Sequence, residues 1–135
     1  MLMNFANSAL NSDQPERFQI LPDRAEFRPV GRMSLSQAVK LVTSSILRAR
    51  ALKKSKLLIS VAELTGFESP DLSARYFFIR EWAAAAQGEV RIALVARPEM
   101  IDPEKFGVTV AANAGLTSNV FASEPEALAW LQNVA

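Results

Sequence analysis

The stretch LLISVA at residues 57–62 is a nearly continuous apolar run of strand length. A second run of this kind, VRIALVA, follows at residues 90–96. Such runs are typical of central parallel strands that are covered on both faces, because a strand with one wet face alternates apolar and polar residues. The two stretches therefore predict the middle of a buried parallel sheet.

Two long helices are predicted around the first run. Residues 35–52 carry apolar side chains at helical spacing, and Ser34 and Gln37 before them have the spacing of a capping box. The members of this apolar face are Leu35, Val39, Val42, Ile46 and Ala49. A second helix is predicted over residues 70–87, with Ser69 as its N-cap and Gly88 at its end.

The ends of the chain add further elements. Residues 17–22 and 26–30 predict a hairpin whose second strand, because it contains Pro29, lies at an edge or carries a bulge. Asp102 and Pro103 predict the start of a shorter helix, and residues 117–121 predict a short strand after it. Ser123 and Glu126 have the spacing of a capping box and predict the start of the last helix. The order β-β-α-β-α-β-α-β-α predicts an α/β fold, a mainly parallel sheet with helices packed on it.

The domain is predicted to span residues 17–135. Residues 1–16 are polar and without periodicity, so we expect a flexible N-terminal arm there. No basic start precedes an apolar segment, and no stretch of about 20 apolar residues occurs, so the expected location is cytoplasmic, without an integral membrane segment.

The composition excludes several kinds of chemistry. The 135 residues contain no cysteine and no histidine, which excludes disulfides, thiolate sites and the commonest general base. Glu99, Asp102 and Glu104 are oxygen donors that a hard cation takes, but Asp102 is more simply a helix cap. We expect no metal site, no cofactor and no enzymatic activity.

Charge is unevenly distributed along the chain. Residues 1–56 hold ten Lys/Arg and four Asp/Glu, and residues 57–135 hold five and ten, giving +6 and −5, which sum to +1. The densest basic run extends from Arg48 to Lys56. It fits either a phosphate-binding patch or, as we expect, a helix C-terminus followed by a solvated turn. No nucleic-acid motif accompanies the run, so no nucleic-acid partner is expected.

Several segments resemble a known family. The hairpin that leads into Gly31-Arg32, the stretch VARPEMIDPEKFG at 95–107 and the stretch VFASEPEALAWL at 120–131 look like parts of bacterial SpoIIAA-like (STAS-like) domains. The resemblance covers residues 17–134. It implies the same α/β fold and a non-enzymatic role: docking a protein partner or, as in the Sec14-like lipid-binding relatives, holding an apolar molecule.

The resemblance also implies a candidate phosphorylation site. It places Glu68-Ser69 where anti-anti-sigma proteins carry an Asp-Ser pair whose serine is phosphorylated. Pro70 and Asp71 depart from the small residues that follow in the family. A phosphate at a helix start meets free amides, but here it would also lie beside two carboxylates.

The carboxyl ends of parallel strands are where ligands bind in such sheets. The candidate binding residues there are Arg32, Thr65, Glu68, Ser69, Arg97 and Met100. Arg32 and Arg97 suit a carboxylate or phosphate, unless each pairs with a nearby acid such as Glu99 or Glu68. The glycines are isolated, so a phosphate loop is not expected.

The second helix has more large apolar residues than one face can bury. Leu72, Ile79, Trp82 and Ala86 fit a core face, which leaves Tyr76, Phe77 and Phe78 as candidate interface residues. Phe77 and Phe78 are either covered by the neighbouring helix or the arm, or part of an apolar patch that forms a homodimer interface or a lipid-like pocket.

Three function classes follow. The first is a regulatory or protein-interaction module with a protein partner or a second copy of itself. The alternative is a carrier of a small apolar or lipid-like ligand, and an enzyme without His or Cys is the least favoured. The pathway does not follow from the sequence.

We expect Ser69 to be unphosphorylated in cells, because a phosphate would be repelled by Glu68 and Asp71. Intact-mass measurement on protein purified from its native source checks this. A stoichiometric mass increase of one phosphate group that maps to Ser69 would contradict it.

Overall fold

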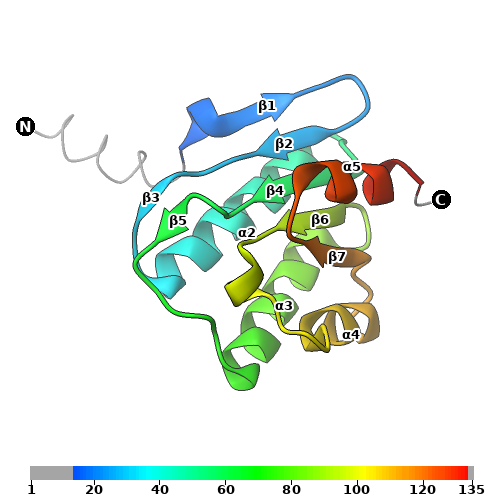
Figure 1. The fold of residues 1–135 in the computed structure, drawn as a ribbon. Coiled ribbons are helices and arrows are strands. Elements are labelled where there is room, and N and C mark those ends of the chain that lie inside the picture. The colour runs from blue at the N-terminus through cyan, green and yellow to red at the C-terminus, as the bar shows by residue number, and fades with distance from the viewer. Residues whose placement is uncertain (1–13, 134–135) are drawn as a thin grey trace, which may run out of the picture.

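The computed structural model describes residues 14–133, which form one mixed sheet with helices on both faces (Figure 1). The main sheet has the order β1-β2-β4-β6-β7. Its strands are β1 (Phe18–Ile20), β2 (Ala25–Phe27), β4 (Lys56–Ser60), β6 (Arg91–Val95) and β7 (Ser118–Phe121). The helices are α2 (Leu35–Ala51), α3 (Leu72–Ala86), α4 (Phe106–Asn113) and α5 (Glu124–Asn133).

Only the first pair of strands is antiparallel, and all other neighbours in the main sheet are parallel. The predicted α/β class and order of elements are therefore confirmed. The expectation that Pro29 marks an edge or a bulge is wrong: β2 lies between β1 and β4. The strand ends at Phe27, so Pro29 takes no part in the ladder.

Short elements that the sequence did not predict lie around this sheet. Two of them, β3 (Gly31–Arg32) and β5 (Leu64–Thr65), pair as a separate parallel ribbon. The other two are 3₁₀ turns, η1 (Pro15–Arg17) and η2 (Pro98–Met100). Strands of two residues carry no alternation, so no sequence pattern indicates them.

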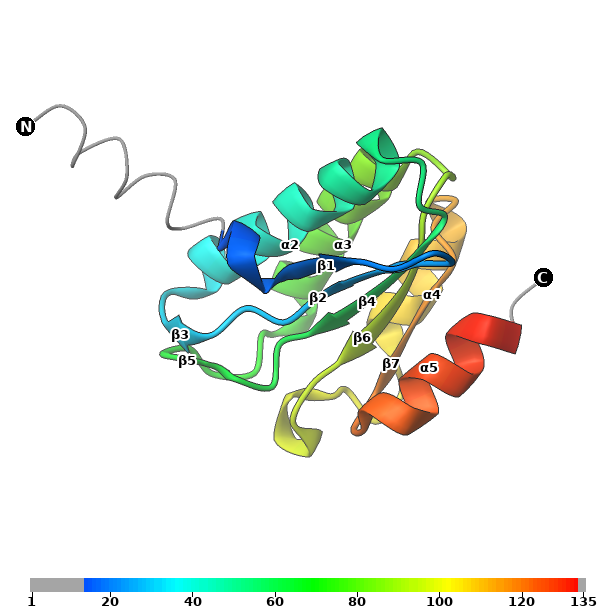
Figure 2. The ribbon, with the colours of Figure 1, turned by 90° about the horizontal axis from the view of Figure 1, so that it is seen from above.

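Two hydrophobic cores lie on opposite faces of the sheet (Figure 2). The larger core joins α2, α3 and α4 to one face, where Phe27, Leu57 and Ile59 are buried. The smaller core joins Ala127 and Leu131 of α5 to Leu58, Ala93 and Val95. Successive residues of β4 thus serve opposite cores, as expected for a strand covered on both faces.

Helix boundaries follow local capping chemistry. The Ser34 hydroxyl accepts from the Gln37 amide at 3.1 Å, and the Gln37 side chain accepts from the Ser34 amide at 2.9 Å, so the predicted capping box of α2 is confirmed. The prediction of Ser69 as the N-cap of α3 is wrong. Asp71 caps that helix by accepting from the Ala74 amide at 2.8 Å. Serine and aspartate are about equally good caps, so residue preference alone does not choose between them.

Part of the basic run has structural contacts. The Arg48 guanidinium lies 4.5 Å from the centre of the Phe18 ring, Arg50 donates to the Ala85 carbonyl at 2.8 Å, and Lys54 donates to the Pro22 carbonyl at 3.1 Å. These contacts hold the end of α2 to β1, to α3 and to the turn after β1.

Residues 1–13 of the expected arm lie outside the described residues. The Gln14 side chain is bonded to the domain in both directions, since it donates to the Val30 carbonyl at 2.7 Å and accepts from the Val30 amide at 2.8 Å. Within residues 14–133, no helix has the length and apolar character needed to cross a membrane.

An ion network covers the part of the sheet beside α5. Glu26 is buried and pairs with Arg24 at 2.7 Å and with Arg28 at 2.7 Å, and Arg28 also pairs with Glu124 at the start of α5 at 2.8 Å. Burial raises the pKa of Glu26, but its hydrogen bonds with Arg24 and Arg28 outweigh this, so its pKa is lowered overall. The hydrogen bond with Arg28 likewise lowers the pKa of Glu124.

We expect Glu26→Gln to lower the free energy of unfolding at pH 7 by about 1–3 kcal/mol, because the two arginines lose a charged partner. A carboxylate whose pKa is lowered in the fold stabilises above its ordinary value of 4.5, and this contribution is lost as pH falls. Urea unfolding should therefore show the gap between wild type and variant narrowing below that pH. Glu89→Gln, at an exposed position, serves as control, and a gap that does not change with pH would contradict the network.

Candidate functional site

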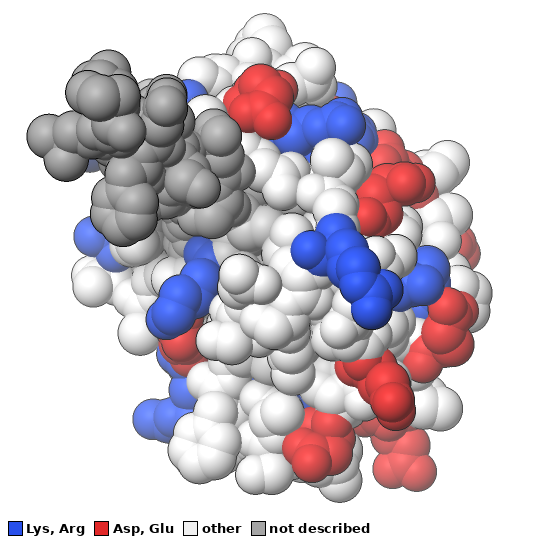
Figure 3. All heavy atoms as spheres, turned by 90° about the vertical axis from the view of Figure 1, so that its left-hand side faces the viewer, with Lys and Arg blue, Asp and Glu red and all other residues white. Residues whose placement is uncertain are grey.

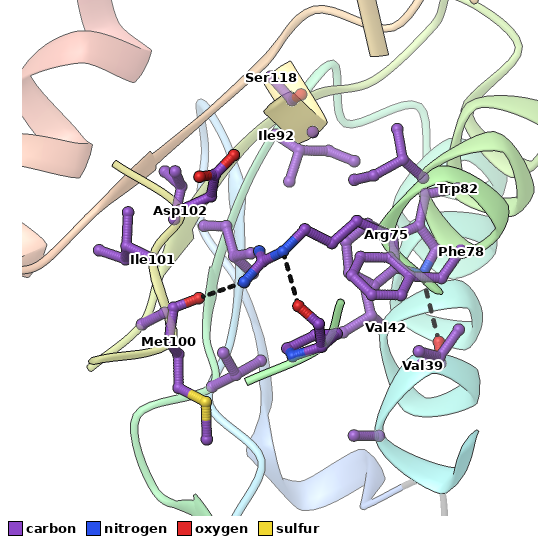
Figure 4. A pocket seen from close by; sticks show the side chains of 18 of the residues that line it. Val39, Val42, Arg75, Phe78, Trp82, Ile92, Met100, Ile101, Asp102 and Ser118 are labelled. Atoms are coloured by element: carbon purple, nitrogen blue, oxygen red, sulfur yellow. Dashed lines mark hydrogen bonds between the residues drawn. The ribbon is translucent and has the colours of Figure 1, made fainter. Parts of the chain in front are cut away.

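A cavity of about 120 Å³ lies between the sheet and the helices α2 and α3 (Figure 4). It opens near the carboxyl ends of the strands, where parallel sheets commonly bind ligands. Most of its lining is apolar. The principal apolar side chains are Val39 and Val42 of α2, Phe78 and Trp82 of α3, and Ile92 and Leu94 of β6.

Side chains of α2 and α3 that face each other form the walls of this cavity. Leu35 and Val39 belong to the predicted buried face of α2, yet both are only half-buried, and both line the cavity. The Phe78 ring packs on the Trp82 ring with centres 4.7 Å apart. The Trp82 indole donates to the Val39 carbonyl at 3.3 Å, which ties α3 to α2 and fixes the indole against the cavity.

Arg75 of α3 reaches across the cavity, as Figure 4 shows. Its Nε donates to the Pro70 carbonyl at 3.0 Å. Its Nη2 donates to the Ser69 hydroxyl at 2.9 Å and to the Met100 carbonyl at 3.1 Å. One side chain thus joins the first turn of α3, the loop before it and the turn η2.

Arg97 lies on the strand side of the cavity. Its Nη2 donates to the Leu64 carbonyl at 3.1 Å, and its Nη1 is 3.5 Å from a Glu99 carboxylate oxygen. Its Nε is buried and has no hydrogen-bond partner among residues 14–133. The expected pairing with Glu99 is therefore present, but it leaves one buried donor unsatisfied.

The remaining polar groups of the lining come from the start of α4 and from β7. Asp102 accepts from the Phe106 amide at 2.7 Å, and this hydrogen bond lowers the pKa of its carboxyl. Lys105 donates to the Asn119 side chain at 2.9 Å and lies 5.2 Å from the centre of the Phe121 ring. The prediction that Asp102 and Pro103 start this helix is wrong: α4 begins at Phe106 with Lys105 as its N-cap, and Asp102 accepts from the first amide of the helix from four residues before it. Residues 14–133 contain no group of three or more Asp or Glu placed to hold a metal ion.

The structure brings part of the predicted site together. Arg97 and Met100 line the cavity, and the Ser69 hydroxyl accepts a hydrogen bond from Arg75, which also lines it. Arg32 and Thr65 instead face each other in the β3–β5 ribbon, outside the cavity lining. Glu68 is exposed.

Gly66, directly after β5, lies very close to the backbone of Met33, which connects β3 to α2. A Cβ atom built on Gly66 would lie 2.5 Å from the Met33 carbonyl oxygen, and the residue has φ +104°. Glycine is therefore required here, and the β5 loop is held against the start of α2.

The aromatic residues of α3 divide between two environments. Phe78 lines the cavity, whereas Tyr76 and Phe77 are exposed and touch edge to face with ring centres 5.5 Å apart. Ile79, Trp82 and Ala86 are buried as predicted, but the prediction of Leu72 as a core residue is wrong, since it is exposed. The helical period identifies residues on one face but not which turns of that face meet the sheet.

Arg75 and Lys105 were not among the predicted site residues. Nothing in the sequence next to Arg75 indicates a hydrogen bond to a carbonyl 25 residues away. The signal that could have found both residues is a basic side chain at the N-cap or in the first turn of a helix, which places it near the carboxyl edge of the sheet.

We expect Arg75→Met to lower the free energy of unfolding by about 1–3 kcal/mol, because charge-assisted hydrogen bonds to two carbonyls are lost. Hydrogen exchange should also quicken at Met100 and Ile101, whose amides close the η2 turn. Arg80→Met is the control, since Arg80 is exposed and contacts only the Tyr76 ring among the described residues. Equal effects of the two substitutions would contradict the role of Arg75.

Comparison with known proteins gives one finding on the fold. No protein-family model matches the chain, and no curated protein matches it significantly. Among solved structures, it is similar to the anti-sigma factor antagonist SpoIIAA in its unphosphorylated form, over 87% of this chain and 99% of that chain, with 18% sequence identity and a TM-score of 0.42. The role of anti-sigma factor antagonist belongs to SpoIIAA, and this comparison does not transfer it to the chain described here. The chain itself has an α/β fold, with the mainly parallel sheet and the order of main elements that its sequence predicts.

Proposed function

We propose that this chain is a non-enzymatic regulatory module that works by binding a protein partner. The observation that supports this best is an apolar surface at the start of α3, the α3 patch, formed by Leu72, Tyr76 and Phe77. Their exposed fractions are 56%, 42% and 69%. Contiguous large apolar side chains in water are typical of interaction sites, because their burial supplies most of the free energy of association.

The patch continues into a groove between α2 and α3. Leu35, Val39, Phe77 and Phe78 form its apolar floor, and Lys40 and Glu81 lie along it. In Figure 3, which looks at the side of β3 and β5, uncharged surface fills much of the centre and charged side chains lie around it. An apolar floor bordered by charged side chains, here Lys40 and Glu81, is a common layout of a protein interface.

The size of the patch favours a transient partner over a permanent second copy. Three side chains of this kind, each about half exposed, offer roughly 300 Å², whereas a stable interface buries about 800 Å² per partner. The exposed carboxylates of Glu68 and Asp71 lie next to the patch in the chain. A partner segment that presents an apolar anchor beside a lysine or arginine fits this surface best.

A binding role also agrees with the hydrogen bonds and ion pairs that the polar groups near the cavity make. The Asp102 carboxylate accepts from the Phe106 amide, and Glu99 is paired with Arg97. Arg75 and Arg97 donate to main-chain carbonyls. These groups therefore act as structural or binding groups rather than as an acid–base pair.

We expect Phe77→Ser to abolish capture of the partner while leaving the fold intact, because Phe77 is the most exposed member of the patch. The measurement is affinity capture from the native source with quantitative mass spectrometry. Leu52→Ser is the matched control, since Leu52 is also a large exposed apolar residue but follows the end of α2.

The proposal requires a protein that wild type and Leu52→Ser both retain and Phe77→Ser does not. Equal capture by all three would contradict it. Sedimentation at micromolar concentration tests the second copy: a dimer that Phe77→Ser dissociates would replace the outside partner with a homodimer.

A second function is supported by a separate observation. The cavity of about 120 Å³ is bounded by apolar side chains on three elements, α2, α3 and β6. An apolar cavity of similar size, about 150 Å³, binds a molecule such as benzene. The chain therefore also suits a carrier or sensor of a small apolar ligand, and the space is far too small for a two-chain lipid.

A further inference from the structure

We infer that the cavity beneath α3 binds a small monocarboxylate whose apolar part has about six carbon atoms, with its carboxylate on Arg97. The inference rests on the carrier function proposed above and specifies the chemical class of its ligand. The size limit follows from the cavity volume of about 120 Å³, since benzene fills a cavity of roughly 150 Å³.

The apolar part of such a ligand matches the inner wall. Phe78 and Trp82 present two rings from α3 that are tilted by 41° against each other, and Val39 and Val42 present branched side chains from α2. Ile92 and Leu94 of β6 close the opposite side. A linear or cyclic hydrocarbon of about six carbons placed here leaves water entirely for apolar contacts, which stabilises the complex.

The charge of the lining favours an anion. Three cations, Arg75, Arg97 and Lys105, contribute to the lining against the carboxylate of Asp102, and Glu99 beside Arg97 reduces the balance from +2 to +1. Asp102 is already committed to the amides of Phe106 and Glu104. A ligand with one negative charge therefore meets net positive charge, whereas a ligand with a cationic group would be repelled.

Arg97 is the group that a carboxylate would contact. Its Nε is buried without a hydrogen-bond partner among residues 14–133, an arrangement that destabilises the empty site. Its Nη2 uses the Leu64 carbonyl for one bond and has a second hydrogen. Nε and Nη2 form one edge of the guanidinium, and a carboxylate binds such an edge with two parallel hydrogen bonds.

Isothermal titration calorimetry with hexanoate and hexanamide tests the inference. The two probes have the same chain, and only the first carries a charge. We expect hexanoate to bind at least tenfold more tightly, as charge-assisted hydrogen bonds exceed neutral ones. Phenyl phosphate is a third probe, because tighter binding of a phosphate than of hexanoate would overturn the assignment to a carboxylate.

The location of binding is read from Trp82. The chain has two tryptophans, Trp82 in the cavity and Trp130 on α5, so a Trp130→Phe background leaves the cavity indole as the only reporter. Hexanoate should change the fluorescence of this variant with the same midpoint as the calorimetric titration. Binding without any change at Trp82 would contradict the location.

Arg97→Gln should weaken hexanoate binding at least tenfold and leave hexanamide unaffected. Arg32→Gln is the matched control: it removes one positive charge at an exposed position on the same edge of the sheet, outside the cavity lining. If Arg97→Gln fails to fold, Val39→Phe fills the cavity instead and should abolish binding of both probes.

The outcomes separate the two proposals. If neither probe binds, the carrier function and the inference both fail. If hexanamide binds as tightly as hexanoate, or if Arg32→Gln weakens hexanoate as much as Arg97→Gln does, the carrier function stands and the carboxylate assignment fails.

Discussion

The carboxyl edge of this sheet depends on one side chain, Arg75. Its guanidinium donates to the carbonyls of Pro70 and Met100 and to the hydroxyl of Ser69. These partners belong to two different crossover segments, which no ladder hydrogen bonds connect. The hydrogen bonds of Arg75 therefore join the loop before α3 to the turn η2. The same side chain forms part of the cavity wall, so the stability of the edge and the shape of the candidate site have a common origin.

The cavity follows from an uneven distribution of side-chain size along α3. The second half of the helix contains Ala83, Ala85 and Ala86, all buried, which allow close approach to the sheet and to α2. The middle turns carry Phe78 and, one turn on, Trp82, whose rings pack on each other and line the cavity. Phe78 also lines the outer groove together with Phe77 of the α3 patch, so a ligand inside and a partner outside would contact neighbouring turns of one helix.

Much of the fold was predictable from local patterns, but the site was not. The buried strands at 57–62 and 90–96 and the capping box at Ser34 are signals within a few residues, and the structure confirms each to within about two positions. The cavity depends on how two helices pack, and the bond from Arg75 to Met100 joins residues 25 apart. Leu72 was misplaced because a helical period does not say where a helix meets the sheet. Ser69 was misplaced as a cap because Asp71 competes equally well for the same role.

Intermolecular nuclear Overhauser effects between hexanoate and methyl-labelled protein test the central claim most directly. The account holds that an apolar space under α3 is open to a small ligand from the carboxyl edge. It predicts contacts from the hexanoate chain to the methyl groups of Val39 and Val42 on α2 and of Ile92 and Leu94 on β6, all of which line the cavity. Contacts confined to the exposed methyl groups of Leu47, Leu52 and Leu72 would show that the cavity is closed in solution and would contradict the account.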